Sequence, residues 1–225
     1  MTVPASSILS ALLMLFVLLA MLSIVYKSWR NGISPMPASA EVRRAVAAEL
    51  NRLTGAACGR YPKGSRMPTD GRMPAGAEPA SPDFAYSIVE AGSGWGTLAL
   101  HLAKSRPDWR ITGIENSLIP WMVSRLARRL SACRNTVFHR SDLYDYRYEH
   151  ADAVICYLYP GAMKRLDPLL RRQLRAGARV VSICFALPGW QAEKIITCRD
   201  MYRTKIYVYR QINIRCPDAL HDYPV

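Results

Sequence analysis

One stretch near the middle of the chain constrains the fold more than any other. Residues 84–97 read FAYSIVEAGSGWGT, so an apolar, strand-like segment runs through Glu90 into three closely spaced glycines. A strand that passes through such a turn into a helix is typical of nucleoside-binding α/β proteins. The glycines let the backbone turn sharply and approach a ligand closely, although a tight turn without a ligand would need them too. The loop therefore favours a binding site.

The spacing of these glycines narrows the choice of ligand. A dinucleotide fingerprint reads G-x-G-x-x-G, and a phosphate-binding P-loop requires Lys and Ser or Thr after its last glycine. Here the spacing is G-x-G-x-G, and Thr97-Leu98 follows without a lysine. Both phosphate-binding interpretations are weakened.

Two more acidic residues follow predicted strands. Glu115 ends the strand-like residues 110–114, nineteen positions beyond Gly96, where a carboxylate can accept hydrogen bonds from both ribose hydroxyls. Asp142 follows another predicted strand at 135–139. Taken singly, each is also explained as a surface or turn residue. Together with Glu90 they form a series at the carboxyl ends of successive strands, where open α/β sheets bind ligands.

The N-terminal segment differs from the rest of the chain. Residues 7–26 are almost wholly apolar and uncharged, and twenty helical residues span about 30 Å, the thickness of a hydrocarbon core. A signal peptide is the alternative, because Ala38-Ser39-Ala40 resembles a cleavage site. That site lies well past the apolar run, and no Lys or Arg precedes the run. We therefore favour a transmembrane anchor. Basic residues follow it, which predicts a cytoplasmic catalytic domain at the membrane: Lys27, Arg30, Arg43 and Arg44.

The net charge of +13 implies an anionic partner, either lipid headgroups or nucleic acid. Next to a membrane anchor, an anionic lipid surface is the simpler explanation. The basic residues are spread over predicted helices, and no RNA-binding signature accompanies them, so nucleic acid is not expected. The six cysteines form no C-x-x-C pair and no zinc spacing with histidine, so no metal site is expected.

Residues 27–83 connect the anchor to the domain. They contain an amphipathic pattern at 41–53, which predicts a helix that covers the cofactor site or lies along the membrane. Residues 55–82 are rich in Gly and Pro and lack a hydrophobic period. Such a loop is either disordered or a functional lid, and we favour the lid.

Residues 84–212 alternate between helical and strand patterns, which is typical of a doubly wound sheet, and 213–225 form a tail. The predicted helices are 95–105, 118–131 and 161–175, and the predicted strands after the first are 110–114, 135–139, 152–157 and 178–184. Two further strands are predicted at 192–199 and 203–212, because residues 205–210 alternate with period two.

These features resemble class I S-adenosylmethionine (SAM) methyltransferases, whose first motif is E/D-x-G-x-G-x-G. Glu90, Gly92, Gly94 and Gly96 stand at the matching positions. The resemblance implies an α/β Rossmann-like sheet, mostly parallel with a C-terminal antiparallel hairpin, and SAM as cofactor. It also implies that Asp142 accepts a hydrogen bond from the adenine amine. The implied cofactor residues are Glu90, Gly92, Ser93, Gly94, Gly96, Glu115, Asn116, Asp142 and Leu143.

A narrower resemblance comes from residues 157–190, which end in the turn Leu187-Pro188-Gly189-Trp190. They are similar to a small membrane-tethered family that includes the mitochondrial lysine methyltransferase acting on the c-ring protein of ATP synthase, over roughly residues 41–210. This resemblance implies SAM-dependent N-methylation of lysine in a membrane-associated protein. DNA and glutamine methylases commonly show N/D-P-P-Y/F where this chain has Tyr157-Leu158-Tyr159-Pro160, which counts against those substrates.

Lysine must lose its proton before it can accept a methyl group. With a pKa near 10.4, deprotonation at pH 7 costs about 4.6 kcal/mol, and apolar or aromatic surroundings reduce that cost. We expect such a wall from residues at strand ends: Tyr157, Tyr159, Pro160 and Trp190. Two alternatives stay open, a methyltransferase for a lipid or small membrane-associated acceptor and a non-catalytic scaffold with this fold.

Overall fold

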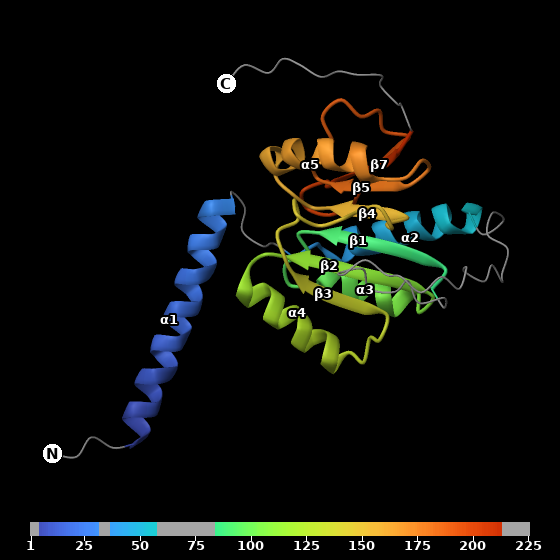
Figure 1. The fold of residues 1–225 in the computed structure, drawn as a ribbon. Coiled ribbons are helices and arrows are strands. Elements are labelled where there is room, and N and C mark those ends of the chain that lie inside the picture. Colours follow the sequence, from blue (N-terminus) through green and yellow to red (C-terminus); the bar gives the residue numbers. More distant parts are fainter. Residues whose placement is uncertain (1–4, 32–36, 58–83, 213–225) are drawn as a thin grey trace, which may run out of the picture.

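The computed structural model describes residues 5–31, 37–57 and 84–212, and Figure 1 shows one sheet between layers of helices. The helices are α1 (Ala5–Asn31), α2 (Ala40–Ala57), α3 (Thr97–Ser105), α4 (Leu118–Leu130) and α5 (Pro160–Gln173). The strands are β1 (Tyr86–Ala91), β2 (Trp109–Glu115), β3 (Thr136–Arg140), β4 (Ala153–Cys156), β5 (Arg179–Ile183), β6 (Lys194–Thr197) and β7 (Lys205–Arg210). The predicted elements are confirmed, with ends that differ by a few residues.

The sheet has the strand order β3-β2-β1-β4-β5-β7-β6. Strands β1 to β5 run parallel, and β7 lies antiparallel to both β5 and β6. This confirms the predicted Rossmann-like sheet with a C-terminal antiparallel pair. The strand order reverses between β1 and β4, so the loops that follow these two strands diverge and leave a crevice at the carboxyl ends.

Two apolar clusters cover the two faces of the sheet. One joins α2 and α3 to the sheet and includes Trp121 and Ala127 of α4, and the other joins α5 to the sheet. The inner strands are therefore buried on both faces, as in β4, where all four residues are buried. This explains why these strands read as continuous apolar runs rather than as alternating patterns.

Helix α2 packs into the first of these clusters. Val42, Val46 and Leu50 are almost fully buried. Glu49 is only 3% exposed and pairs with Arg52 and, at 2.6 Å, with Lys194 of β6. Hydrogen bonding from Arg52 lowers the pKa of Glu49, so the carboxylate is ionised. Its ion pair with Lys194 joins α2 to β6. The expectation that this helix covers the cofactor site or lies along the membrane was wrong, because its apolar face forms part of the core.

The segments outside the domain are described only in part. The predicted loop at 55–82 begins within α2, which continues to Ala57, and residues 58–83 lie outside the described residues, as does the predicted tail at 213–225. The predicted N-terminal helix is present as α1. Among the described residues, no helix is both long enough and apolar enough to cross a membrane, so the structure does not confirm the predicted anchor.

Candidate functional site

The glycine loop between β1 and α3 adopts a conformation that few other residues tolerate. Gly92, Gly94 and Gly96 have φ values of 75°, 52° and 73°. The amides of Gly92 and Ser93 donate to the Ile114 carbonyl of β2 at 2.9 and 2.8 Å, which ties the loop to the neighbouring strand. Positive φ is inexpensive only for glycine, so the residue types predicted from the motif are those that the backbone requires.

Two of these glycines also allow a close approach of side chains. A Cβ on Gly92 would lie 2.7 Å from Leu158, in the segment after β4, and a Cβ on Gly96 would lie 2.6 Å from the Phe138 ring. The loop is thus packed against the segment after β4 on one side and against β3 on the other. It lies at the switch point of the sheet, where doubly wound folds bind ligands.

Glu115 connects the loop to the next helix. Its Oε2 accepts a hydrogen bond from the Gly94 amide at 2.9 Å, and its Oε1 accepts one from the Ser117 amide at 2.7 Å. The sequence predicted a carboxylate that accepts ribose hydroxyls, and the structure adds that the same carboxylate holds the loop and the start of α4. Each oxygen has a second lone pair, so binding a sugar remains compatible with both contacts.

Glu90 lies beneath the loop and is 5% exposed. One of its oxygens accepts a hydrogen bond from the Ala99 amide in the first turn of α3, at 3.0 Å. Burial raises the pKa of Glu90 to about 8, with a smaller contribution from the negative charge of Glu115, while the Ala99 hydrogen bond opposes the rise. Glu90 is therefore largely protonated at neutral pH, when no cationic group is bound beside it.

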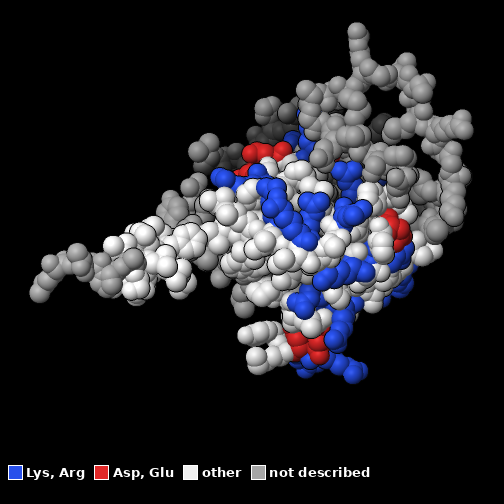
Figure 2. Space-filling view, turned by 90° about the horizontal axis from the view of Figure 1, so that it is seen from below, with Lys and Arg blue, Asp and Glu red and all other residues white. Residues whose placement is uncertain are grey.

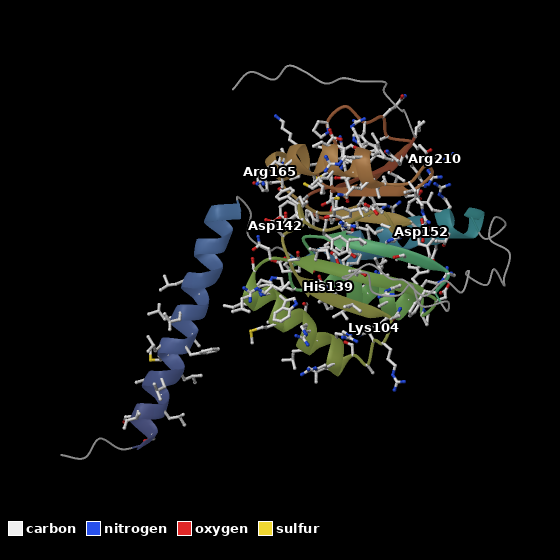
Figure 3. All side chains as sticks on the ribbon, in the orientation of Figure 1. Lys104, His139, Asp142, Asp152, Arg165 and Arg210 are labelled. Carbon is white, nitrogen blue, oxygen red and sulfur yellow. The ribbon has the colours of Figure 1, made fainter. Side chains whose placement is uncertain are left out.

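An open cavity of about 300 Å³ lies next to the loop, at the ends of β2 and β3. It is lined by Asn116, Arg140, Ser141 and Asp142. One oxygen of Asp142 accepts a hydrogen bond from the Tyr144 amide at 3.0 Å, which orients the carboxylate. Figure 3 shows Asp142 on the same side of the sheet as Arg165 and opposite Asp152 and Arg210. Asp142 thus lies at the carboxyl edge, as predicted.

These residues suit a polar ligand that donates hydrogen bonds. Glu115 and Asp142 contribute acceptor oxygens, and a phosphate group would be repelled by these carboxylates. The Ser93 hydroxyl is buried against Gly113 of β2, 2.9 Å from where a Cβ on that glycine would lie, and has no hydrogen-bond partner among the described residues. Leu143 lies beside the site, where its carbonyl accepts a hydrogen bond from Tyr148 at 2.7 Å.

The carboxyl edge continues past β4 with two partly buried tyrosines. Tyr157 packs against the core cluster on the α2 and α3 face, and burial raises the pKa of its hydroxyl. Tyr159 lies just before α5, and its ring covers Gly161, where a Cβ would lie 2.6 Å from the ring. Pro160 is the first residue of α5 and is exposed. These three residues lie in one segment, as expected.

Trp190 does not join them, and the prediction of a shared wall must be corrected. Its indole nitrogen donates a hydrogen bond to Asp167 of α5, and the Arg171 guanidinium lies 4.9 Å from the ring centre. The ring also meets Tyr209 of β7, edge to face, at 5.9 Å. Trp190 therefore packs on the α5 face of the sheet, whereas Tyr157 packs on the opposite face. The chain after β5 turns back over α5, which the sequence pattern did not reveal.

The sequence pattern also did not reveal that the turn between β6 and β7 lies beside Tyr157. Asp200 of the β6–β7 turn accepts hydrogen bonds from the Thr204 amide at 2.7 Å and from the Thr204 hydroxyl at 2.6 Å. Asp200, Tyr202 and Cys184 lie close enough to Tyr157 to influence its pKa, and Tyr202 is 74% exposed. One indirect signal for this position is present in the sequence. Two antiparallel strands are predicted after β5, and the turn between them lies at the carboxyl edge when the second strand runs antiparallel to β5.

The sheet order, the glycine loop and the acidic residues at the strand ends define a class of fold, the Rossmann-like α/β sheet that methyltransferases use. Residues 90–194 match a family model described as the ANTKMT methyltransferase domain. This part of the chain is therefore similar to a methyltransferase domain, and the chain is also similar to the lysine methyltransferases described below.

Two curated relatives show the similarity in detail. Adenine nucleotide translocase lysine N-methyltransferase of Mus musculus is 36% identical over 114 residues, which are 48% of each chain. The Homo sapiens lysine N-methyltransferase that is named for the C subunit of ATP synthase is 30% identical over 112 residues, which are 48% of this chain and 46% of the relative. The chain thus spans about half the length of the curated relatives it matches.

Solved structures support the fold. An RNA methyltransferase from Salinibacter ruber, in complex with S-adenosyl-L-homocysteine, has a TM-score of 0.54 at 24% sequence identity. The superposition covers 61% of this chain and 87% of the Salinibacter chain. TrmN from Thermus thermophilus has a TM-score of 0.50 at 16% sequence identity, and the superposition covers 57% of this chain and 45% of the TrmN chain. At these identities the likeness concerns the fold alone.

Proposed function

We propose that this protein is a SAM-dependent methyltransferase that N-methylates lysine in a membrane-associated protein. The observation that carries the proposal is the glycine loop, which Glu115 holds against β2 beside a cavity lined by Asp142. This site lies within residues 90–194, which match the ANTKMT methyltransferase domain model, and the chain is similar to lysine N-methyltransferases.

The donors and acceptors of the site fit SAM. Glu115 would accept hydrogen bonds from the ribose hydroxyls, Asp142 would accept one from the adenine amine, and the loop between Gly92 and Gly96 would face the amino-acid part. Glu90, buried under the loop, would face the positive end of the ligand, whose charge would favour the ionised form of this carboxyl group. When bound, SAM supplies a methyl group activated by a sulfonium.

The residues after β4 would receive the acceptor. Tyr157 and Tyr159 are partly buried at the carboxyl edge, so they would surround a lysine side chain with aromatic rather than aqueous surroundings. Desolvation lowers the pKa of an ammonium group, which increases the fraction of neutral amine available for transfer. These side chains would also position the nitrogen for in-line attack, which is worth several kcal/mol in well-oriented reactions.

We place the enzyme at the cytoplasmic face of a membrane, with α1 as its anchor. The proposal is supported by the apolar, uncharged run at residues 7–26 and by the basic residues that follow it. It is also supported by the exposure of large apolar side chains along α1, such as Leu9 at 70% and Phe16 at 70%. The net charge of +13 suits an anionic lipid surface.

A transfer assay tests the activity. The full chain is incubated with methyl-labelled SAM and membranes from cells that lack it, and mass spectrometry then locates the label. We expect methylated lysine in a protein. Label in the lipid extract would instead support a lipid acceptor, and SAM binding without any transfer would support a scaffold.

A matched pair of variants tests the cofactor site. Glu115→Gln replaces one of two acceptor oxygens, so the hydrogen bonds to Gly94 and Ser117 cannot both be kept. A hydrogen bond to a charged group contributes about 1.5–3 kcal/mol, so we expect SAM to bind about 10- to 100-fold more weakly in calorimetry. Asp145→Asn removes a nearby exposed charge and should leave affinity within about twofold. Equal affinities in both variants would contradict the assigned role of Glu115.

A further inference from the structure

Helix α4 packs Trp121 and its small residues toward the sheet, whereas most of its other large apolar residues face outward. Pro120 and Ser124 are its buried residues, and Ala127 packs against the core. Five large apolar side chains are exposed, namely Leu118 (43%), Met122 (55%), Val123 (41%), Leu126 (57%) and Leu130 (80%). A surface helix normally buries its apolar stripe, and grouped apolar residues at a surface mark an interaction site. We call these five residues the outer face of α4.

Arginines flank this outer face on one side. At 100° per residue, Arg129 falls between Leu118 and Met122 at one margin of the apolar stripe, Arg125 falls next to that margin, and Arg128 lies farther round the helix. Helix α4 contains no acidic residue. Arg125 lies over the Trp121 ring at 4.8 Å, and Arg128 donates a hydrogen bond to the Cys133 carbonyl at 3.3 Å. In the part of the chain that the structure describes, none of the three forms an ion pair. Figure 2, seen from below and thus from the side of α4, shows Lys and Arg gathered in a band with few acidic residues.

Helix α1 extends the same apolar surface. It contacts α4, and α1 and the start of α4 lie on the side of the molecule toward which the carboxyl ends of the strands point, whereas the rest of α4 runs back alongside β3 (Figure 1). The side chains of α1 that the structure describes are exposed, and the large apolar ones range from 51% to 74%. Two neighbouring helices therefore present large apolar side chains, and α4 adds arginines that form no ion pair among the described residues.

We propose that the outer face of α4 lies in the interfacial layer of a membrane that contains anionic lipids. A helix with leucines on one face and arginines beside it is typical of helices that lie in the membrane plane. An apolar protein partner would leave the arginines without counter-charges, whereas anionic headgroups supply them at the level of the interface. The proposal extends the membrane location proposed above, because it adds a second contact that would orient the domain.

This contact would also orient the candidate active site. The amide of Ser117, the residue before α4, donates to Glu115, and Asn116 lines the cavity. The start of the membrane-facing helix is thus bonded directly to the residue that holds the glycine loop. With α4 in the interface, the carboxyl edge of the sheet would be held at the membrane surface, where a lysine near the headgroups can reach it.

Photo-crosslinking of the full chain tests the proposal. The photoreactive amino acid benzoylphenylalanine is placed singly at Met122 in the outer face, at Leu13 in α1, and at Lys164, an exposed position on α5. Each protein is reconstituted with vesicles of phosphatidylcholine and phosphatidylserine, illuminated, and analysed for lipid adducts by mass spectrometry. We expect lipid adducts at Met122 at least about tenfold above those at Lys164.

The three positions separate failure of this inference from failure of the anchor. If Leu13 forms lipid adducts but Met122 forms no more than Lys164 does, the inference is overturned and the anchor is retained. Adducts at Met122 but not at Leu13 would support the inference and overturn the anchor. Background levels at both positions would overturn both. Crosslinks from Met122 to a second copy or to another protein in place of lipid would overturn the inference, because the outer face would then be a protein interface.

A charge test adds a second measurement. The variant Arg125→Gln/Arg129→Gln should lower the lipid adducts at Met122 by at least about fivefold, the factor that corresponds to ~1 kcal/mol for one basic residue near an anionic surface. The matched variant Lys164→Gln/Arg172→Gln removes charge from exposed positions on α5 and should change them by less than about twofold. Equal losses in the two variants would show that only net charge matters and would overturn the assigned role of α4.

Discussion

The two halves of the carboxyl edge are built in different ways. In the half formed by β1, β2 and β3, the site depends on a fixed backbone: three glycines have positive φ, and the Glu115 carboxylate accepts hydrogen bonds from two main-chain amides. In the half formed by β4, β5 and the β6–β7 turn, it consists of side chains such as Tyr157 and Tyr202. A backbone site tolerates few substitutions, whereas side chains on turns can change without altering the fold.

This difference matches the division of labour that we propose. One cofactor serves every reaction of such an enzyme, so the half that holds it can be rigid and defined by glycine. The acceptor differs between enzymes, so the half that receives it can vary. Substitutions in the first half should therefore affect cofactor binding and folding together, and those in the second half should affect only the use of the acceptor.

The largest expected effect concerns Glu90, under the cofactor loop. Its pKa is about 8 in the folded protein and 4.5 ordinarily, so between these values the folded state binds more protons than the unfolded state. Stability contributed by Glu90 is then complete below pH 4.5 and is lost as the pH rises through 8. At about 1.4 kcal/mol per pKa unit, the loss approaches roughly 5 kcal/mol.

The variant Glu90→Gln measures this loss, because its side chain stays neutral and its carbonyl can still accept from Ala99. In urea unfolding measured from about pH 4 to pH 9, we expect the free energy of unfolding of Glu90→Gln to increase relative to that of the wild type as the pH rises. Subtracting the two curves removes the contributions of other carboxylates, such as Glu49, whose pKa is lowered. A difference that stays flat with pH would show that Glu90 is ionised in the folded protein.

The next effect concerns Gly96, which combines positive φ with a close contact. A Cβ there would lie 2.6 Å from Phe138 and 2.8 Å from Ser124. We expect Gly96→Ala to lower the free energy of unfolding by about 2–4 kcal/mol, from backbone strain and overpacking together, and to abolish measurable SAM binding.

Two other glycines are controls for this substitution. Gly177 has φ 85° but no heavy atom within 4 Å of an added Cβ, so Gly177→Ala isolates backbone strain, about 1–2 kcal/mol. Gly55 lies within α2 and is also free of contacts, so Gly55→Ala should stabilise by about 0.5–1 kcal/mol. If Gly96→Ala costs no more than Gly177→Ala, the contact with Phe138 has no energetic role.

The backbone half could be predicted from the sequence because residue type encodes backbone conformation there. Glycines at 92, 94 and 96 are needed for positive φ, and carboxylates after successive strands converge because parallel strands end at one edge. The parallel sheet followed from the alternation of helices and strands, and the final pair followed from the family resemblance.

The side-chain half could not be predicted in this way, because its residues meet only through tertiary packing. Trp190 follows β5 closely in the sequence, yet its loop turns back over α5, where Asp167 and Arg171 hold the indole. The amphipathic patterns of α2 and α4 have the same ambiguity. A pattern shows that a helix has an apolar face, but not whether that face meets the sheet, as in α2, or points outward, as in α4.

The smallest expected effect is a difference in kcat/KM between variants of Tyr157 and of Trp190. It tests whether the acceptor binds beside the end of β4, where we propose it. Tyr157→Ala removes aromatic surface beside the acceptor, so we expect kcat/KM for the protein acceptor to fall about tenfold, or ~1.4 kcal/mol, with SAM affinity unchanged. Trp190→Phe keeps an aromatic ring on the α5 face and loses the hydrogen bond to Asp167. It should change kcat/KM by less than about twofold, while lowering the free energy of unfolding by about 1 kcal/mol. The reverse ranking in kcat/KM would place the acceptor on the α5 face and would move the acceptor half of the site away from the end of β4.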